Sequence, residues 1–336
     1  MVNIALAMVA IILALFAGLT SALIIGPARV AALFIVSTGT PEAGEKVVIT
    51  SWQAPAVAQI SKEENAKLIE YGRDLIIYTS KYLGPNGSVK SISNGMNCQN
   101  CHLDAGTKAF GNNYSAVAST YPKLRARSGM DESIEKRVND CFERSLNGKS
   151  LPDDNQEMMA IVAYIKWVGK DVEKGTAPNG AGLMELKLLD RSASMENGKV
   201  VYDQQCIVCH GKDGGGIALA DSSGYQFPPL WGDHSYNAGA GLYRLSRFAG
   251  YVKANMPLGA TFDQPILSDE EAWDVAAYVN LLPRPGMDVS HDWPDISKKP
   301  IDHPFGPYAD GFDEAQHKLG PFKPIKEKQK ALSSTR

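Results

Sequence analysis

The chain begins with a long apolar segment. Residues 2–26 are almost wholly apolar, and the first charged side chain is that of Arg29. At about 1.5 Å per residue, a helix of this length crosses a hydrocarbon core roughly 30 Å thick. Most cleavable signal peptides have a basic residue before a shorter apolar run, whereas no Lys or Arg precedes this segment. Thr20-Ser21-Ala22 could nevertheless serve as a cleavage site. Within residues 1–28 we therefore favour a retained anchor in the inner membrane over a cleaved signal. In either case the rest of the chain is exported to the periplasmic side.

The pattern changes after this segment. Residues 29–60 mix apolar residues with Thr, Pro, Ala and Gly, and we interpret them as a tether. From Ser61 onward, apolar residues recur at helical spacing, and Ser61 with Glu64 resembles a capping box. We therefore expect a first helical domain over residues 61–173.

Two further helices are predicted in this domain. One covers residues 131–147, with Asp131 as its N-cap and Gly148 as its stop. The other begins after Asp153 or Asp154, and its apolar positions recur at helical spacing.

The same order of elements then repeats. Residues 174–190 contain Gly and Pro and are predicted to form a linker. A second domain over residues 191–284 has three predicted helices, at residues 193–202, 239–255 and 268–282. Prolines and glycines dominate residues 285–336, which predicts an extended or partly disordered tail. No stretch alternates strongly enough to predict a sheet.

The composition narrows the class of protein. With 336 residues, the length favours two or three domains, and 44% hydrophobic and 21% charged residues are ordinary for a globular protein. A net charge of −3 supplies no basic surplus to neutralise phosphates, which argues against a general nucleic-acid-binding role. The five cysteines do not suggest a disulfide framework, and four of them fall in two identical patterns.

These four cysteines form two C-x-x-C-H motifs, Cys98-Gln-Asn-Cys101-His102 and Cys206-Ile-Val-Cys209-His210. The spacing lets both thiols of a motif form thioethers to one haem, with the adjacent His as proximal iron ligand. A four-cysteine zinc site would leave both histidines unexplained, and a redox C-x-x-C pair would need a βαβ setting. We therefore predict two covalently bound haem c groups. The fold class expected is all-α: two tandem class I cytochrome c domains, an N-terminal hydrophobic helix and an extended Pro/Gly-rich tail.

Each iron also needs a candidate ligand on its other face. In the second domain, Met256 precedes Pro257 at the end of a predicted helix, where its thioether can point at the iron. Packing in the core is the alternative role for Met256, and Lys253 is a minor alternative ligand. We predict that His210 and Met256 bind the second iron.

The first domain has no methionine before proline in the corresponding region, but it has the remaining cysteine, Cys141. A lone cysteine is most often a buried structural thiol. However, an unpaired cysteine in an oxidising compartment is a liability unless it is used. Lys136, Arg137 and Arg144 lie close in sequence and favour a thiolate. We therefore predict that Cys141 is an iron ligand or a catalytic residue.

Several stretches carry a more specific resemblance: Cys101-His102-Leu-Asp-Ala-Gly-Thr107, Tyr121-Pro-Lys-Leu-Arg125-Ala-Arg127, residues 137–148, and Ser297-Lys-Lys-Pro-Ile-Asp-His303-Pro-Phe-Gly-Pro-Tyr308. Together they resemble the dihaem thiosulfate dehydrogenases, a tetrathionate-forming family of c-type cytochromes. The likeness extends from about residue 61 to residue 324. Its most diagnostic element is Cys141, with Arg137 four residues before it and Ser145 four residues after it.

The resemblance implies a reaction and a set of roles. Two thiosulfates would be joined into tetrathionate, in a reaction that could also run in reverse, at a first haem with His102 and Cys141 as axial ligands. The second haem would pass electrons to a cytochrome or a similar acceptor. Cys141 would leave the iron and hold a sulfur fragment, while Arg127, Arg137 and Ser145 would line the substrate site.

Elementary electrostatics agrees with these roles. A dianion that approaches a protein of net charge −3 needs a local positive field, and guanidinium groups match oxyanions with paired donors. On a regular helix, Arg137, Cys141 and Ser145 would share one face. Without the resemblance, Arg127 and Arg137 are equally well explained as solvated or ion-paired residues.

One position departs from the family, and one competing function stays open. Some relatives have Lys directly before the ligand methionine, where this chain has Asn255, so a ligand switch at the second haem is in doubt. The alternative function is a non-catalytic, membrane-anchored dihaem electron carrier of a respiratory or photosynthetic complex. Cys141 and its arginines favour the enzyme, since a carrier needs no site for a dianion.

Overall fold

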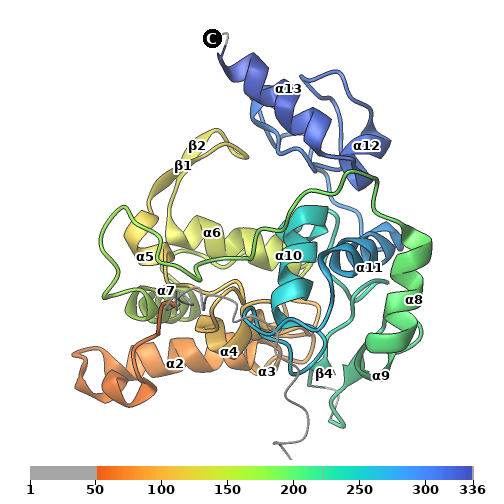
Figure 1. Cartoon of the computed structure of the whole chain (residues 1–336). Helices are drawn as coiled ribbons and strands as arrows, with labels where there is room; N and C mark the ends of the chain where they lie inside the picture. Colours follow the sequence, from red (N-terminus) through yellow and green to blue (C-terminus); the bar gives the residue numbers. More distant parts are fainter. Residues whose placement is uncertain (1–50, 222, 335–336) are drawn as a thin grey trace, which may run out of the picture. The chain divides into compact units, whose positions relative to one another are not determined.

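The computed structural model describes residues 51–221 and 223–334 (Figure 1). The predicted anchor and residues 29–50 of the predicted tether lie outside this range. In the part of the chain that is described, no helix is long and apolar enough to cross a membrane.

The first half of the described chain is mainly helical, as expected. Short 3₁₀ helices at Val57–Lys62 and Cys98–Asn100 accompany the α-helices, which are α2 (Ala66–Ile77), α3 (Thr79–Leu83), α4 (Leu103–Gly106), α5 (Val117–Thr120), α6 (Ile134–Asp140) and α7 (Gln156–Val168). The second half repeats the arrangement with α8 (Met195–Gln205), α9 (Ile207–His210), α10 (Leu245–Asn255) and α11 (Asp269–Leu281).

Two short β-ribbons interrupt the helices, which the sequence pattern did not predict. β1 (Lys123–Arg125) pairs antiparallel with β2 (Met130–Glu132), and β3 (Ile217–Ala218) pairs with β4 (Tyr225–Phe227). Strands of two or three residues are too short to show the alternation on which strand prediction depends.

The β1–β2 ribbon also moves the start of the helix predicted at residues 131–147. Because Asp131 is in β2, it cannot cap this helix. Ser133 is the N-cap of α6 instead, and its hydroxyl accepts a hydrogen bond from the backbone N–H of Lys136 at 3.1 Å. The prediction of Asp131 as the cap was therefore wrong by two residues.

Two other predicted caps were also wrong. The Ser61 hydroxyl donates to the carbonyl of Ala58 inside a 3₁₀ helix, so it does not start α2. α7 is capped by Asn155, whose side chain accepts from two backbone N–H groups, and not by Asp153 or Asp154. By contrast, the predicted cap Ser268 is confirmed, because it forms a capping box at the start of α11.

In each half, the first and last helices cross closely at a glycine. α2 packs against α7, where a Cβ on Gly72 would lie 1.9 Å from the carbonyl oxygen of Ala160. α8 packs against α11, where a Cβ on Gly198 would also lie 1.9 Å from a carbonyl oxygen, that of Asp274. No side chain fits at either crossing. The same contact in both halves shows that one helical unit occurs twice.

The C-terminal segment is more ordered than its composition predicted. Residues 285–313 contain one short 3₁₀ helix, Ile296–Lys298, and then α12 (Glu314–Leu319) and α13 (Lys323–Ser334) follow. Asp313 caps α12 through the backbone N–H of Gln316. Phe322 is buried against Trp273 of α11, with ring centroids 5.6 Å apart. Buried apolar residues such as Phe322 are sparse in a Pro- and Gly-rich segment. They therefore produce no helical or strand periodicity from which the contact could be predicted.

Candidate functional site

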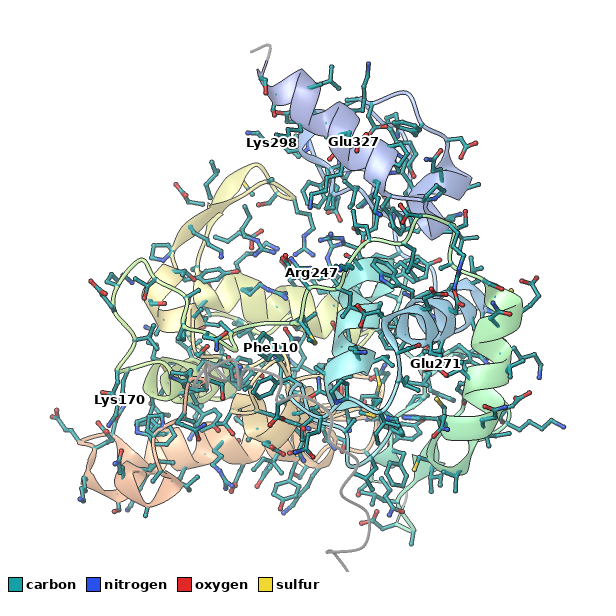
Figure 2. The ribbon with its side chains drawn as sticks, in the orientation of Figure 1. Phe110, Lys170, Arg247, Glu271, Lys298 and Glu327 are labelled. Atoms are coloured by element: carbon teal, nitrogen blue, oxygen red, sulfur yellow. The ribbon has the colours of Figure 1, made fainter. Side chains whose placement is uncertain are left out.

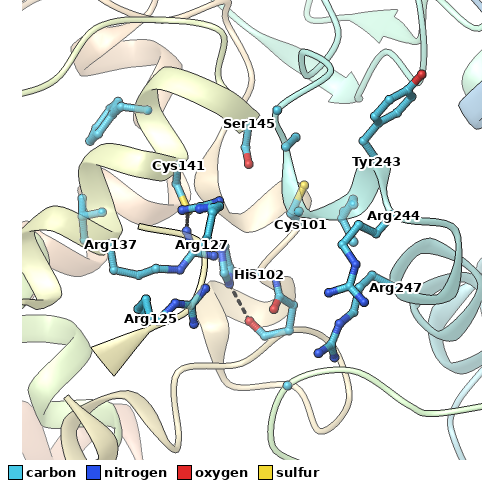
Figure 3. A pocket seen from close by; sticks show the side chains of 18 of the residues that line it. Cys101, His102, Arg125, Arg127, Arg137, Cys141, Ser145, Tyr243, Arg244 and Arg247 are labelled. Atoms are coloured by element: carbon cyan, nitrogen blue, oxygen red, sulfur yellow. Dashed lines mark hydrogen bonds between the residues drawn. The ribbon is translucent and has the colours of Figure 1, made fainter. Parts of the chain in front are cut away.

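A cavity of about 660 Å³ lies beside the first C-x-x-C-H motif (Figure 3). Cys98, Cys101 and His102 line it together with apolar side chains, which include Ile76, Phe142, Leu146, Ile161 and Ile165. A volume of this size is typical of cofactor and ligand sites. The apolar lining and the two adjacent thiols suit a covalently attached haem.

The proximal histidines of both motifs are oriented in the same way. His102 Nδ1 lies 2.5 Å from the carbonyl oxygen of Asn112, and His210 Nδ1 lies 3.0 Å from that of Pro228. A carbonyl can only accept, so Nδ1 carries the proton in each ring and Nε2 is left with a free lone pair. This tautomer is the one that a metal-binding imidazole needs. The residues present in both domains therefore fit an iron-bound haem.

Cys141 lies directly after α6, where the chain passes from an α-helix into a π-helix. α6 ends at Asp140, and residues Cys141–Ser145 form one turn of π-helix. π turns are rare and occur frequently at functional sites. The prediction of a regular helix with Arg137, Cys141 and Ser145 on one face was therefore wrong in geometry. All three side chains nevertheless line the cavity.

The surroundings of Cys141 favour its thiolate. The guanidinium of Arg137 donates from Nη1 to the Cys141 sulfur at 3.2 Å. Burial by itself raises the pKa of Cys141, but the charge of Arg137 and a hydrogen bond with His102 outweigh it and lower the pKa to about 7. The contact with His102 brings the sulfur next to the predicted proximal ligand. In contrast, burial raises the pKa of free Cys98 and Cys101 to about 12.

The cavity is strongly basic. Only one carboxylate, that of Asp292, is among its described lining residues, against six basic side chains: Lys123, Arg125, Arg127, Arg137, Arg244 and Arg247. The β1–β2 ribbon and the turn within it supply the first three of these. A cavity with such an excess of positive charge attracts small anions even in a protein whose net charge is −3.

Some of these cations already have partners. Arg127 forms an ion pair with Asp140, which is also bound by Lys136. Arg244 is paired with Asp302, at 2.6 Å from Nη2 to Oδ1. Arg137 differs from both, because no carboxylate of the described chain lies within salt-bridge distance of it and its charge acts directly on Cys141.

At the second motif, Met256 directly follows the last residue of α10 in an extended conformation. Lys253, the alternative ligand, is engaged elsewhere. Its ammonium group lies 2.6 Å from the carbonyl oxygen of Leu267 and 2.9 Å from Asp269. These contacts disfavour Lys253 as a ligand. Asn255 is also engaged, since its amide donates to the carbonyl oxygens of Phe110 and Tyr251.

Several cavity residues were not predicted from the sequence. Lys123 and Arg125 lie in the stretch that carries the family resemblance but gave no separate signal, and Arg247 belongs to the second domain. Trp293 and His303 come from the C-terminal segment. Residues so far apart in sequence share no spacing that could reveal a common site.

Two helical units, each with an oriented C-x-x-C-H histidine, define a dihaem c-type cytochrome. Comparison with known families agrees with this class. Residues 88–173 match the family described as "SoxA/TsdA, cytochrome c domain", and residues 195–283 match "Cytochrome c".

Known relatives define the particular family. The chain is 36% identical to a thiosulfate dehydrogenase of Allochromatium vinosum over 260 residues, which cover 76% of this chain and 93% of that protein. It is also 36% identical to a thiosulfate dehydrogenase of Psychrobacter arcticus over 259 residues, which cover 76% of this chain and 75% of that protein. The chain belongs to the dihaem thiosulfate dehydrogenase family. It is an oxidoreductase that acts on thiosulfate and carries two covalently attached c-type haems.

A solved structure is similar as well. The thiosulfate dehydrogenase (TsdBA) from Marichromatium purpuratum, in its as-isolated form, matches with a TM-score of 0.64 and 30% sequence identity. The match covers 70% of this chain and 50% of that one.

Proposed function

We propose that this protein joins two thiosulfates into tetrathionate in the basic cavity of the first cytochrome domain. Electrons then leave through the second domain to an external cytochrome or a similar acceptor. The observation that carries the proposal is the Cys141 sulfur, which lies beside both His102 and the guanidinium of Arg137, a cation with no carboxylate partner in the described chain. A half-buried thiolate facing a haem-binding histidine inside an anion-attracting cavity has no use in a simple electron carrier.

The proposal assigns each haem its protein ligands. Cys98 and Cys101 would hold the first haem, and His102 and Cys141 would bind its iron. Cys206 and Cys209 would hold the second haem, and His210 and Met256 would bind its iron. When bound, each haem supplies a one-electron acceptor. The hydrogen bonds from His102 and His210 to backbone carbonyls support the proximal assignments, because they leave Nε2 of each ring free.

The sulfur chemistry balances in two steps. First, the Cys141 thiolate forms an S–S bond with the terminal sulfur of one thiosulfate, the sulfur that carries no oxygen. This step releases two electrons, and the two haems would accept one each. The terminal sulfur of a second thiosulfate then attacks the sulfur atom that is bonded to Cys141. The bond to Cys141 breaks, its thiolate is regenerated and tetrathionate leaves. By microscopic reversibility the reverse reaction uses the same groups, and we propose that the enzyme is reversible.

Arg127, Arg137 and Ser145 bind the first thiosulfate in this scheme. Arg137 is the strongest candidate, since it contacts the reacting sulfur and has no carboxylate partner in the described chain. Arg127 keeps its ion pair with Asp140 while it lines the cavity. Arginine suits this role because its planar fork offers paired donors to sulfonate oxygens.

The proposal also includes the organisation of the whole chain. We assign residues 61–173 to the catalytic domain, 174–190 to a linker, 191–284 to the electron-transfer domain and 285–336 to a C-terminal extension. Cytochromes of this class are typically exported, and the apolar residues 2–26 are long enough to anchor the protein to the inner membrane. The catalytic site would then face the periplasm.

The test compares the wild type with a Cys141→Ala variant. We expect the wild type to reduce its haems with thiosulfate and to form tetrathionate. The variant should keep both haems, measured by the pyridine haemochrome absorbance, but lose turnover. The ferric wild type should also show a low-spin thiolate-ligated spectrum that the variant lacks. Equal turnover in the two proteins would remove Cys141 from the mechanism and favour the electron-carrier function.

A further inference from the structure

Cys141 begins a turn whose hydrogen bonds are those of a π-helix. The backbone N–H of Leu146 donates to the carbonyl oxygen of Cys141 at 2.9 Å, and that of Gly148 donates to the carbonyl oxygen of Phe142 at 2.8 Å. The side chains of Cys141 and Ser145 both face the cavity from this turn (Figure 3). Because α-helical winding is the usual geometry, a π turn persists only where its surroundings favour it.

The next two carbonyl groups of this turn are bound by one residue of the second cytochrome domain, Asn237. The backbone N–H of Asn237 donates to the carbonyl oxygen of Arg144 at 3.0 Å, and its side-chain amide donates to that of Glu143 at 2.8 Å. The same amide also donates to Oδ1 of Asn147 at 3.0 Å. The last carbonyl groups of a helix have no partner within the helix, and a buried carbonyl without a partner is costly. Asn237 supplies these partners.

Asn237 is held in a single orientation by its own loop. Its side-chain oxygen accepts from the backbone N–H of Gly239 at 3.0 Å, which leaves the amide NH2 to face the π turn. Its backbone carbonyl accepts from the N–H of Ala240 at 3.0 Å. Asn237 is only 2% exposed, and each of its polar atoms has a hydrogen-bond partner within the protein. It therefore acts as a rigid support for the turn.

The loop that carries Asn237 is tied to the first domain at a second point. The backbone N–H of Asn94 donates to the carbonyl oxygen of Leu146 at 2.9 Å, and its side-chain amide donates to that of Ser235 at 3.1 Å. In Figure 2, the end of α6 points toward the second domain, next to α10, on which Arg247 is labelled. The π turn is therefore supported from across the boundary between the two domains.

We propose that Asn237 is a positioning residue for Cys141: the second cytochrome domain holds the carbonyl groups of the π turn and thereby keeps the Cys141 sulfur beside His102 and Arg137. This inference rests on the proposed function, in which the Cys141 thiolate binds the first iron and forms the bond to thiosulfate. Asn237 is not among the described residues that line the cavity, so it acts only through the turn. Without its amide, the buried carbonyl of Glu143 loses its partner, α-helical winding competes with the π turn, and the sulfur is displaced.

The experiment compares Asn237→Ala with a matched change, Asn280→Ala. Asn280 is also buried in the second domain, and its amide donates to the carbonyl oxygens of Leu242 and Tyr243 at 3.1 and 3.2 Å, so these bonds stay inside that domain. Imidazole is added to each ferric protein, where it competes with Cys141 for the first iron. The loss of the thiolate-ligated absorption and electron paramagnetic resonance signals gives the imidazole concentration of half-displacement.

Asn237→Ala should lower this concentration about fivefold, as expected for the loss of one buried hydrogen bond. Its kcat should fall by a similar factor, while the thiosulfate KM should change by less than about twofold, because the arginines of the cavity remain in place. Asn237→Asp keeps the shape of the side chain but loses the amide donors, so it should show the same decrease. Asn280→Ala should keep the wild-type half-displacement concentration and the wild-type kcat.

The outcomes separate this inference from the proposed function. Wild-type values of half-displacement and kcat in both Asn237 variants would show that Asn237 does not position Cys141, and so would an equal loss in Asn280→Ala. If the wild type itself has no thiolate signal and Cys141→Ala keeps full turnover, the proposed function fails instead. The haem absorbance of each variant, measured before imidazole is added, confirms that it has folded.

Discussion

At the scale of single residues, Arg137 connects the electrostatics of the site to its chemistry. Its guanidinium lies 3.2 Å from the Cys141 sulfur, and the charge of that sulfur is the main reason that the pKa of Arg137 rises above its usual value. The same attraction lowers the pKa of Cys141. Each group therefore stabilises the charged form of the other. The Cys141 thiolate can then act as a nucleophile next to a guanidinium that can bind the anionic substrate.

We expect Arg137→Gln to lower kcat/KM for thiosulfate by about 10- to 100-fold, because a charge-assisted contact to the anion and to Cys141 is lost. Arg137→Lys should lower kcat/KM less than Arg137→Gln does, since lysine keeps the positive charge although it lacks the paired donors. Rates of haem reduction at varied thiosulfate concentration measure the effect, with Lys149→Gln, which removes an exposed positive charge outside the cavity, as the control. An unchanged kcat/KM in Arg137→Gln would mean that Arg137 does not contact the substrate.

At the scale of elements, the glycine crossings hold each cytochrome unit together. Gly72 and Gly198 occupy equivalent positions, and in both cases the nearest atom to an added Cβ would be a backbone carbonyl oxygen at 1.9 Å. A backbone cannot move aside as a flexible side chain does, so the helices would have to separate. α11 carries Trp273 and Tyr278 in the core of the second unit, and its displacement would disturb that packing.

Gly198→Ala should therefore destabilise the second unit by about 1–3 kcal/mol, the usual cost of overpacking a core. Denaturant unfolding followed by haem absorbance and far-UV circular dichroism measures the change. Gly286→Ala is the matched control, because no atom lies within 4 Å of its added Cβ and its backbone conformation is an ordinary one. Equal unfolding midpoints for Gly198→Ala and the wild type would show that the crossing tolerates a side chain.

At the scale of the whole described molecule, the C-terminal segment ties the two cytochrome units together. Asp292 forms a two-pronged ion pair with Arg144 of the first unit, at 2.7 and 2.8 Å. Asp302 is 1% exposed and binds Arg244 and the backbone N–H of Ser246, both in the second unit. The same segment places Trp293 and His303 at the cavity. It therefore completes the site as well as joining the units.

Asp302→Asn should weaken this attachment by roughly 1–3 kcal/mol at neutral pH, because Arg244 loses a charged partner. Burial tends to raise the pKa of Asp302, but Arg244 and Ser246 outweigh it, so the folded-state pKa is lowered. The wild-type carboxylate therefore contributes its full stability above the ordinary aspartate pKa of about 4. This contribution is lost as the pH falls through the lowered folded-state pKa.

Denaturant unfolding at a series of pH values measures this difference between the wild type and Asp302→Asn. The difference should be constant near neutral pH and should shrink in acid. Asp154→Asn changes an exposed carboxylate and serves as the control. A difference that is the same at all pH values would show that the Asp302 charge does not contribute.

The sequence predicted part of the site and part of the fold for identifiable reasons. Cys141 stood out because it is the single cysteine outside the two haem motifs, whereas Arg137 was assigned to the site through the family resemblance. The π turn at Cys141–Ser145 was missed because helical spacing alone does not distinguish a π turn from an α turn. Asp131 was assigned to the wrong element because the β1–β2 ribbon is too short to produce a pattern.

The sequence by itself determined the chemistry that depends on residues next to one another: the two C-x-x-C-H motifs, and hence the two covalent haems. Such motifs function through spacing along the chain, so they can be recognised before folding. Only the tertiary structure decided the composition of the cavity, in which Arg137, Arg247 and Trp293 come from three distant segments. Their contact depends on the packing of both cytochrome units and the C-terminal segment, and no local pattern encodes such long-range packing.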